Sequence, residues 1–357
     1  MAAYRVIQWA TGGVGRAAIQ GIADHPELEL VGCYVTDPKK VGRDAGEIAG
    51  RAPLGVAASN DVAALLALDA DCVLYSPLMG KADEVQRILE SGKNVVTPLG
   101  WFYPFRNAGS AVLQEAARKA GVTLHGTGIH PGGITERFPL MVSALSGVVT
   151  HVRAEEFSDI RTYGAVAVVR DVMLFGHEPQ NAAKSPMLKI LGGGFEQSID
   201  MLADALGVEL DAKKRTTHEM AVATAPIDSP IGKIAPGRVA AQRFTWQGLV
   251  RGEPFATARV NWLMGEEHLD PPWRFGPAGE RFEVEITGDP SVSLTFHGLH
   301  PESIAQGLER NPGIVATALH CVNSIPYVCK APPGIRTYLD LPLVAGRAAP
   351  SLLRKRA

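Results

Sequence analysis

The chain has 357 residues, of which 46% are apolar and 20% charged, a composition that excludes intrinsic disorder and fits one or two folded domains. A formal net charge of −2 and the lack of a basic, aromatic-rich patch exclude nucleic acid as an expected partner. No apolar run approaches the roughly 20 residues that span a bilayer, so we expect a cytoplasmic protein that binds a small molecule and no membrane. The four cysteines show no CxxC pair or histidine at ligand spacing, and we expect no metal site.

The first part of the chain alternates between short apolar runs and stretches with helical spacing. The apolar runs are Tyr4–Trp9, Leu28–Val35, Cys72–Tyr75, Asn94–Thr97 and Val122–Gly126. This alternation predicts βαβ units and a doubly wound parallel sheet, which is a Rossmann-type α/β domain over residues 1–138. Ligands of such sheets bind outside the carboxyl ends of the strands.

The pattern changes after residue 138 to longer stretches that alternate between apolar and polar residues. These are His151–Phe157, Thr216–Ala225, Arg238–Val250, Ala256–Met264, Phe282–Thr287 and Ser291–Phe296. With intervening helices they predict an α+β domain over residues 139–310, with a mixed or antiparallel open sheet covered on one face. We expect its other face to meet a second subunit. A last helix, with Asn311 as N-cap and Pro312 in its first turn, is expected to pack back on the first domain, which residues 311–345 complete.

A glycine-rich turn follows the first apolar run, in the segment ATGGVGRAAIQGIA. It matches GxGxxG with Ala10 at the first position, Gly12 at the second and Gly15 at the third. The pattern predicts a pyrophosphate loop at the start of a helix, where free N–H groups meet the anion. The predicted loop residues are Thr11, Gly12, Gly13, Val14 and Gly15. Ala10 fits this turn if its φ angle is negative.

The end of the second apolar run carries contradictory signals for the choice of cofactor. Asp37 lies at the distance from the loop where a carboxylate accepts the ribose hydroxyls of NAD. Lys39, Lys40 and Arg43 follow it and could hold the 2′-phosphate of NADP instead. The sequence therefore predicts NAD or NADP without a choice between them. Further along, Ser76, Pro77 and Thr97 follow later strands, and we expect them near the nicotinamide half of the cofactor.

Several segments together resemble the dihydrodipicolinate-reductase-like oxidoreductases that include 2,4-diaminopentanoate dehydrogenase and the native NAD(P)H-dependent amine dehydrogenases. The segments are VIQWATGGVG, HPELELVGCYVTDPKKVGRDAGE, SGKNVVT, GTGIHPGGITERFPL, EITGDPSV and VNSIPYVCKAPPGI. The resemblance implies a homodimer joined through the second sheet, and hydride transfer between nicotinamide and a C–N or C=N carbon. It places Asn323 near the carboxamide, although this residue could instead cap a kink before Pro326.

Two departures from this family concern the chemistry. The amine dehydrogenases carry a glutamate just before their Tyr-Pro pair, whereas this chain has Leu99-Gly100-Trp101-Phe102 there. This predicts poor use of free ammonia, and Leu99→Glu or Gly100→Glu is expected to create ammonia-dependent activity. His130 stands where the relatives more often have asparagine.

Hydride transfer to an imine or carbonyl needs a proton donor within reach, and three residues are candidates. His130 follows a strand and has a suitable pKa if that value is unperturbed, unless it only bonds the backbone of its loop. Tyr103 supplies a phenol on the loop after Thr97. Alternation puts Glu155 and Glu156 on opposite faces of a strand, so only one can face a cleft, and Glu155 is the predicted one.

The sequence leaves two classes of function open. One is an NAD(P)H-dependent oxidoreductase acting on a small, mostly apolar C=N, C–NH2 or C=O compound. The apolar character is inferred from expected cleft walls that include Phe102, Met173 and Phe175. The alternative is a non-catalytic NAD(P)-binding sensor that keeps the fold without the chemistry.

Overall fold

A computed structural model describes residues 3–107, 109–349 and 352 and divides into two compact units. The first unit extends to Gly128 and resumes at Ile314, and the second unit is Ile129–Gly313. This division precedes the boundary expected after residue 138. The reason is packing, because Ile134 in the crossover segment belongs to the hydrophobic core of the second unit.

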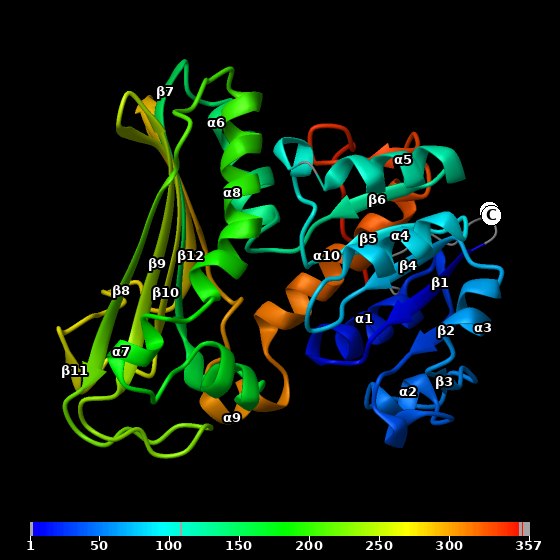
Figure 1. The fold of residues 1–357 in the computed structure, drawn as a ribbon, viewed down its shortest axis with the longest axis horizontal. Coiled ribbons are helices and arrows are strands. Elements are labelled where there is room, and N and C mark those ends of the chain that lie inside the picture. The colour runs from blue at the N-terminus through cyan, green and yellow to red at the C-terminus, as the bar shows by residue number, and fades with distance from the viewer. Residues whose placement is uncertain (1–2, 108, 350–351, 353–357) are drawn as a thin grey trace. The chain divides into compact units, whose positions relative to one another are not determined.

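The first unit contains the predicted parallel sheet, with strand order β14-β6-β5-β4-β1-β2-β3 (Figure 1). Its strands are β1 (Tyr4–Trp9), β2 (Leu28–Tyr34), β3 (Ala58–Ser59), β4 (Cys72–Tyr75), β5 (Asn94–Thr97), β6 (Thr123–Gly126) and β14 (Gly334–Ile335). Its helices are α1 (Gly13–Asp24), α2 (Ala45–Ile48), α3 (Val62–Ala67), α4 (Ala82–Glu90) and α5 (Ser110–Ala120), with most of α10 (Pro312–Val328). Strand β1 pairs with β2 on one side and β4 on the other, so the order reverses at β1, where such sheets bind ligands.

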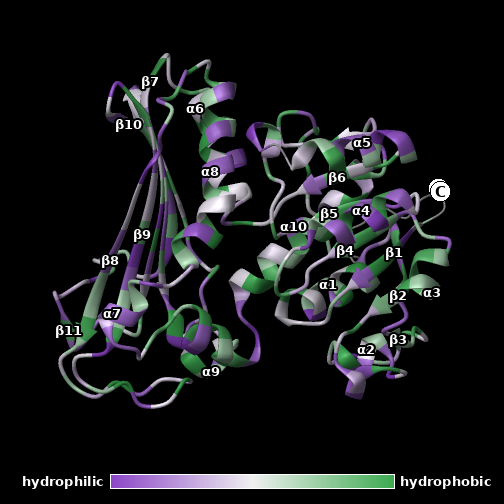
Figure 2. Ribbon diagram, viewed as in Figure 1, coloured by the Kyte–Doolittle hydropathy of each residue, from purple (hydrophilic) through white to green (hydrophobic). Residues whose placement is uncertain are grey.

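Burial explains why these segments form a covered sheet. Every residue of β4 is buried, as expected for a strand with helices on both faces, and α5 carries both hydrophilic and hydrophobic residues along its length (Figure 2). Helix α10 packs on this unit as predicted, because Cys321, Val322 and Ile325 join the core that contains Val6. Its start is capped as expected, with Asn311 Oδ1 accepting from the Gly313 N–H at 2.9 Å.

The second unit is built on a mixed sheet with strand order β11-β8-β9-β10-β7-β12-β13. Its strands are β7 (Val148–Asp159), β8 (Arg215–Ala223), β9 (Val239–Val250), β10 (Glu253–Leu263), β11 (Leu269–Asp270), β12 (Arg281–Asp289) and β13 (Val292–Phe296). Its helices are α6 (Phe138–Ser143), α7 (Pro179–Ala182), α8 (Met187–Ala205) and α9 (Ile304–Glu309). Most neighbouring strands are antiparallel, but β7 and β10 run parallel with Glu156 opposite Val260, so the sheet is mixed, which is one of the two forms expected. Their connection is long enough for a crossover, and alternation alone does not reveal strand direction.

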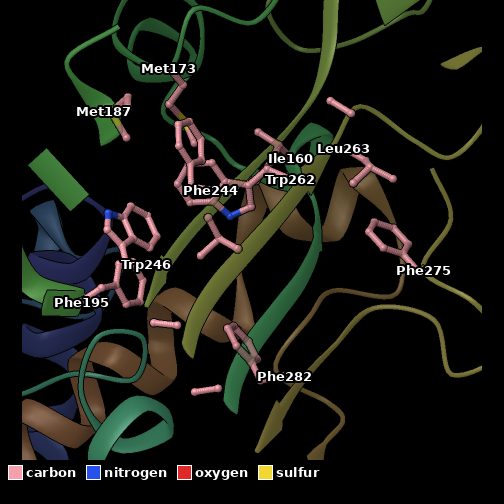
Figure 3. Close-up of a cluster of buried hydrophobic side chains, with 14 of the residues drawn as sticks. Ile160, Met173, Met187, Phe195, Phe244, Trp246, Trp262, Leu263, Phe275 and Phe282 are labelled. Carbon is pink, nitrogen blue, oxygen red and sulfur yellow. The ribbon is translucent and has the colours of Figure 1, made fainter. Parts of the chain in front are cut away.

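One face of this sheet is covered by α6 and α8, while no helix of the described residues lies along the other (Figure 1). On the covered face, Phe195 of α8 stacks on Trp246 of β9 with ring centroids 4.6 Å apart, and Phe244 and Phe282 extend the same cluster (Figure 3). Each large apolar side chain buried here stabilises the fold by about 1.5–3 kcal/mol. This aromatic cluster restrains the strand side chains that point toward α8.

Candidate active site

The turn after β1 has the geometry of a phosphate loop, with one correction to the expectation for Ala10. Its φ is +76°, not negative, so this alanine adopts a left-handed conformation that favours glycine. The side chain of Gln8 holds the turn, because its Nε2 donates to the Ala10 carbonyl at 2.9 Å. A Cβ on Gly15 would lie 2.1 Å from that same carbonyl oxygen, so only glycine allows the helix to approach the strand this closely.

The start of α1 faces open space. A Cβ added to Gly12 meets nothing within 4 Å, and this N-cap residue has no side chain to satisfy the first N–H groups of the helix. Free N–H groups at a helix N-terminus attract anions. The residues of this loop therefore fit the pyrophosphate of a nicotinamide nucleotide.

The charged residues after β2 divide into two groups. Asp37, Lys39 and Arg43 are exposed, and the Asp37 carboxylate accepts from the Lys39 backbone N–H at 3.0 Å. Lys40 instead turns toward the phosphate loop, where its Nζ donates to the Thr11 hydroxyl at 3.1 Å. Lys40 is thereby tied to the loop, and the exposed cations that remain beside Asp37 are Lys39 and Arg43.

The loops after β4 and β5 are adjacent, since these strands pair with each other. Ser76 is buried, and its hydroxyl accepts from Gln8 Nε2 at 2.9 Å, which links this loop to the phosphate loop. Pro77 is half-buried beside it. Thr97 is completely buried, and its Oγ1 accepts from the Leu99 N–H at 3.2 Å, an interaction that shapes the loop.

Two further predicted residues of the first unit are half-buried. Tyr103 packs edge-on against Phe105 with ring centroids 5.0 Å apart. Asn323 lies in α10, one turn before Pro326, which is inside the helix. Phe102, expected to line a cleft, is 2% exposed. Met173 and Phe175 of the second unit are also buried and belong to its hydrophobic core.

His130 lies in the second unit inside an aromatic enclosure. Its ring meets Phe195 and Phe282, with centroids 4.8 and 5.5 Å away, and its side chain is 1% exposed. Burial lowers the pKa of His130 to about 3, against a small opposing effect of the Arg259 backbone, so the imidazole is neutral at pH 7. This corrects the expectation of an unperturbed value. His130 can act here as a neutral hydrogen-bonding group.

Glu156 is the carboxylate nearest to His130, with Oε2 3.8 Å from Nε2. Its other oxygen, Oε1, accepts from the Ser158 hydroxyl at 2.7 Å and from the Trp262 indole N–H at 2.9 Å. Burial raises the pKa of Glu156, and these two donors oppose that rise. The carboxyl group is thus fixed in orientation by neighbours from β7 and β10.

Glu155 points to the opposite face of β7, as the alternation predicted. It accepts from Arg153 and from Asn261, the latter at 2.9 Å, and lies 3.5 Å from Arg259. These contacts make it part of a charged network on the face without helices. The structure brings His130 together with Glu156, and it places the Glu155 carboxylate on the other side of the sheet.

Two further ionisable groups lie near this site, the buried Glu136 and the half-buried His300, and the sequence did not predict His300. Glu136 accepts from the Ser198 hydroxyl of α8, and burial raises its pKa to about 8. His300 lies 2.9 Å from the Ser158 hydroxyl and stacks on Phe282, and burial lowers its pKa to about 4. Both depend on partners far away in the sequence, which leave no local signal.

Two other kinds of feature are absent from residues 3–107, 109–349 and 352. No helix in these ranges has the length and apolar character needed to cross a membrane. No three histidine, cysteine or acidic side chains in the same ranges gather at a spacing that would hold a metal ion.

Two family models match the chain, one for each part of it. Residues 6–125 match the N-terminal domain of dihydrodipicolinate reductase. Residues 136–351 match the C-terminal domain of 2,4-diaminopentanoate dehydrogenase. The second match covers more than half of the chain and includes Glu136, Glu156 and His300.

Named relatives extend this similarity over nearly the full length. An amine dehydrogenase of Streptomyces virginiae is 33% identical over 356 residues, covering 94% of this chain and 96% of the relative. The 2,4-diaminopentanoate dehydrogenase of Acetoanaerobium sticklandii is 27% identical over 294 residues, covering 81% and 78%. An amine dehydrogenase structure from Mycobacterium smegmatis has a TM-score of 0.77 at 22% identity, covering 96% and 97%, which supports the fold.

Proposed function

The chain belongs to the 2,4-diaminopentanoate dehydrogenase family and is an NAD(P)-dependent oxidoreductase acting on C–N groups. We propose that it interconverts a small, mostly apolar amine with the corresponding imine or ketone. The observation that carries the proposal is the pair of His130 and Glu156, polar groups 3.8 Å apart beside the aromatic rings of Phe195 and Phe282. Such an environment suits an apolar substrate with one polar reacting group.

The first unit is proposed to hold the nicotinamide nucleotide, which accepts or donates a hydride when bound. Gly12, Gly15 and the N-terminus of α1 would bind the pyrophosphate. Asp37 would accept from the adenine-side ribose of NAD, or Lys39 and Arg43 would hold the 2′-phosphate of NADP. Ser76, Pro77, Thr97 and Asn323 are proposed for the nicotinamide side, as the family resemblance implies.

The proton-transfer groups are proposed to include His130 and, on the nicotinamide-side loop, Tyr103. Neutral His130 would orient the reacting nitrogen or oxygen through a ring nitrogen, and Tyr103 would donate from its phenol. For Glu155, which was predicted to be catalytic, the contacts with Arg153, Arg259 and Asn261 favour a role in organising the charged face of the sheet.

That face is also the proposed contact between two copies of the chain. It carries no helix of the described residues (Figure 1), and Thr245, Thr257 and Asn261, which point to this face, are only 4%, 4% and 2% exposed. If the same face of two copies meets, the contact is isologous and closes as a two-fold dimer. Light scattering coupled to gel filtration tests it, and a monomer at micromolar concentration would contradict the proposal.

The enzymatic proposal is tested by a steady-state screen of NADH and NADPH turnover with the purified protein. Amines are supplied in the oxidative direction, and ketones with ammonium or preformed cyclic imines in the reductive direction. Turnover with apolar members of any of these sets supports the proposal. Tight nucleotide binding without turnover in all of them would favour the non-catalytic sensor instead.

A further inference from the structure

The two carboxylate oxygens of Glu156 differ, because one is held by hydrogen bonds and the other is open to a ligand. Oε1 is held by the Ser158 hydroxyl and the Trp262 N–H. Oε2 makes no hydrogen bond within the described residues and is not among their completely buried polar atoms. The side chain keeps 14% exposure. A carboxylate fixed through one oxygen and open at the other has the geometry of a ligand-binding group.

The negative charge of Glu156 has no cationic partner, unlike that of Glu155. Glu155 pairs with Arg153 and Arg259, whereas no lysine or arginine of the described residues forms an ion pair with Glu156. Removing a carboxylate from water without a cation partner is costly. The site therefore favours a cation of its own, or a proton, on Oε2.

His130 supplies the second polar group of the site. Its Nε2 is 3.8 Å from Glu156 Oε2, too far for a direct hydrogen bond but close enough for one donor nitrogen to reach both atoms. Neither ring nitrogen of His130 makes a hydrogen bond of normal geometry among the described residues, and both are completely buried. Buried polar atoms without partners commonly mark the place of a ligand or water.

We propose that Glu156 Oε2 binds ammonium, or the protonated amine of the substrate, and removes a proton from it. This inference rests on the proposed function and names the residue that handles the nitrogen. It also supplies within the second unit a carboxylate that the loop Leu99-Gly100-Trp101-Phe102 lacks.

The chemistry balances in the direction of amine formation. Glu156 takes one proton from the ammonium ion, and the free ammonia nitrogen forms a bond to the carbonyl carbon of the ketone. The former carbonyl oxygen receives that proton and a second one from the attacking nitrogen, and it leaves as water. The product of this step is the protonated imine of the ketone, the acceptor of the hydride. Four titratable groups lie around Glu156. His130 faces Oε2, and His300 contacts the Ser158 hydroxyl. The charge of Glu156 raises the pKa values of Tyr163 and Glu280.

The test compares two reactions in the variant Glu156→Gln, which keeps the size of the side chain and removes its charge. One reaction is ammonium-dependent reduction of a ketone, and the other is reduction of a preformed cyclic imine. We expect kcat/KM for ammonium to fall at least about 100-fold, because base catalysis is lost, and imine reduction to change less than about threefold. The control Glu90→Gln, at an exposed position of α4, leaves both reactions unchanged.

Several outcomes would overturn the inference while leaving the proposed function intact. They are ammonium-dependent kcat/KM in Glu156→Gln within twofold of the parent, equal losses in both reactions, and an unmodified enzyme that reduces imines without using ammonium. Loss of ammonium dependence in Glu155→Gln but not in Glu156→Gln would assign the role to the other carboxylate. If Glu156→Gln fails to fold, Glu156→Asp is measured instead, and a rise in the KM for ammonium without a change in imine reduction supports the proposal. Failure of the proposed function looks different, because the unmodified protein then turns over neither substrate.

Discussion

The two units of the molecule use different parts of the chain to build their functional positions. In the first unit, the phosphate loop depends on backbone: on the open approach at Gly12, the close contact at Gly15 and the free N–H groups of α1. In the second unit, His130 and Glu156 depend on side chains whose environment comes from α8, β10 and β12. A backbone site is encoded by a few consecutive residues, whereas a side-chain site is encoded by the packing of a whole sheet.

This difference predicts that a substitution in the second unit lowers turnover without changing the affinity for the nucleotide. His130→Ala is expected to lower kcat/KM by about 10–100-fold, because the variant loses the neutral hydrogen bond that orients the reacting nitrogen or oxygen. The dissociation constant for NAD(P)H, measured by fluorescence titration, is expected to stay within twofold, because the phosphate loop is in the other unit. The control His151→Asn alters a residue that bonds Thr257 on the charged face, and it leaves turnover unchanged. Loss of nucleotide affinity in His130→Ala would contradict this separation.

Within the first unit, two glycines are expected to respond differently to a single added methyl group. Gly15→Ala forces a Cβ to within 2.1 Å of the Ala10 oxygen, so it should lower the free energy of unfolding by about 1–3 kcal/mol and also weaken nucleotide binding. Gly12→Ala meets open space and should leave stability unchanged while weakening nucleotide binding at least about tenfold, because the backbone approach to pyrophosphate is blocked. Urea unfolding and nucleotide titration measure both effects. Equal free energies of unfolding for the two variants would show that the phosphate loop moves enough to avoid the contact between the new Cβ and the Ala10 oxygen.

Glu136 is expected to make the stability of the protein depend on pH. Burial raises its pKa to about 8 from the ordinary 4.5, so the folded state holds a proton that the unfolded state releases. The stabilisation is complete below pH 4.5 and is lost as pH rises toward 8, at about 1.4 kcal/mol per pH unit from this group. Urea unfolding at pH 6, 7 and 8 should show this fall in the parent and a shallower one in Glu136→Gln. The exposed control Glu90→Gln should keep the slope of the parent, and a parallel slope in Glu136→Gln would refute the assignment.

The smallest effect is expected at the end of β2, where the cofactor choice depends on exposed charges. If Arg43 contacts a 2′-phosphate, Arg43→Ala should raise the KM for NADPH by about fivefold or less and leave the KM for NADH unchanged, since an exposed ion pair contributes at most about 1 kcal/mol. If the protein uses NAD, Asp37→Ala raises the KM for NADH instead. Parallel measurements with both nucleotides decide between the two.

Local sequence rules predicted most of the first unit correctly. The strands β1, β4 and β5 begin and end as their apolar runs indicated, because a strand covered on both faces has a continuous apolar signature. The two-residue strands β3 and β14 were missed, since two residues carry no periodicity. The positive φ of Ala10 was also missed, because Gln8 holds it in place through a side-chain contact that no turn pattern includes.

The chemistry of the second unit could be predicted only in part. Alternation correctly placed Glu155 and Glu156 on opposite faces, but it could not say which face carries the helices. That depends on α8 packing against Trp246, a residue far along the chain. The neutrality of His130 likewise follows from enclosure by Phe195 and Phe282, which are distant in sequence.

The position of β7 between β10 and β12 also affects how the protein is made. Both of its partners, β10 and β12, are synthesised much later, so β7 leaves the ribosome with neither edge paired. Folding of the first unit is delayed as well, because its core requires Cys321 and Ile325 from α10. Closing contacts between such distant segments is slow, and unpaired strands are prone to aggregate in the meantime. Neither unit can finish folding until nearly the whole chain has been translated, so this enzyme depends on protection of its nascent chain more than two consecutive domains of the same size would.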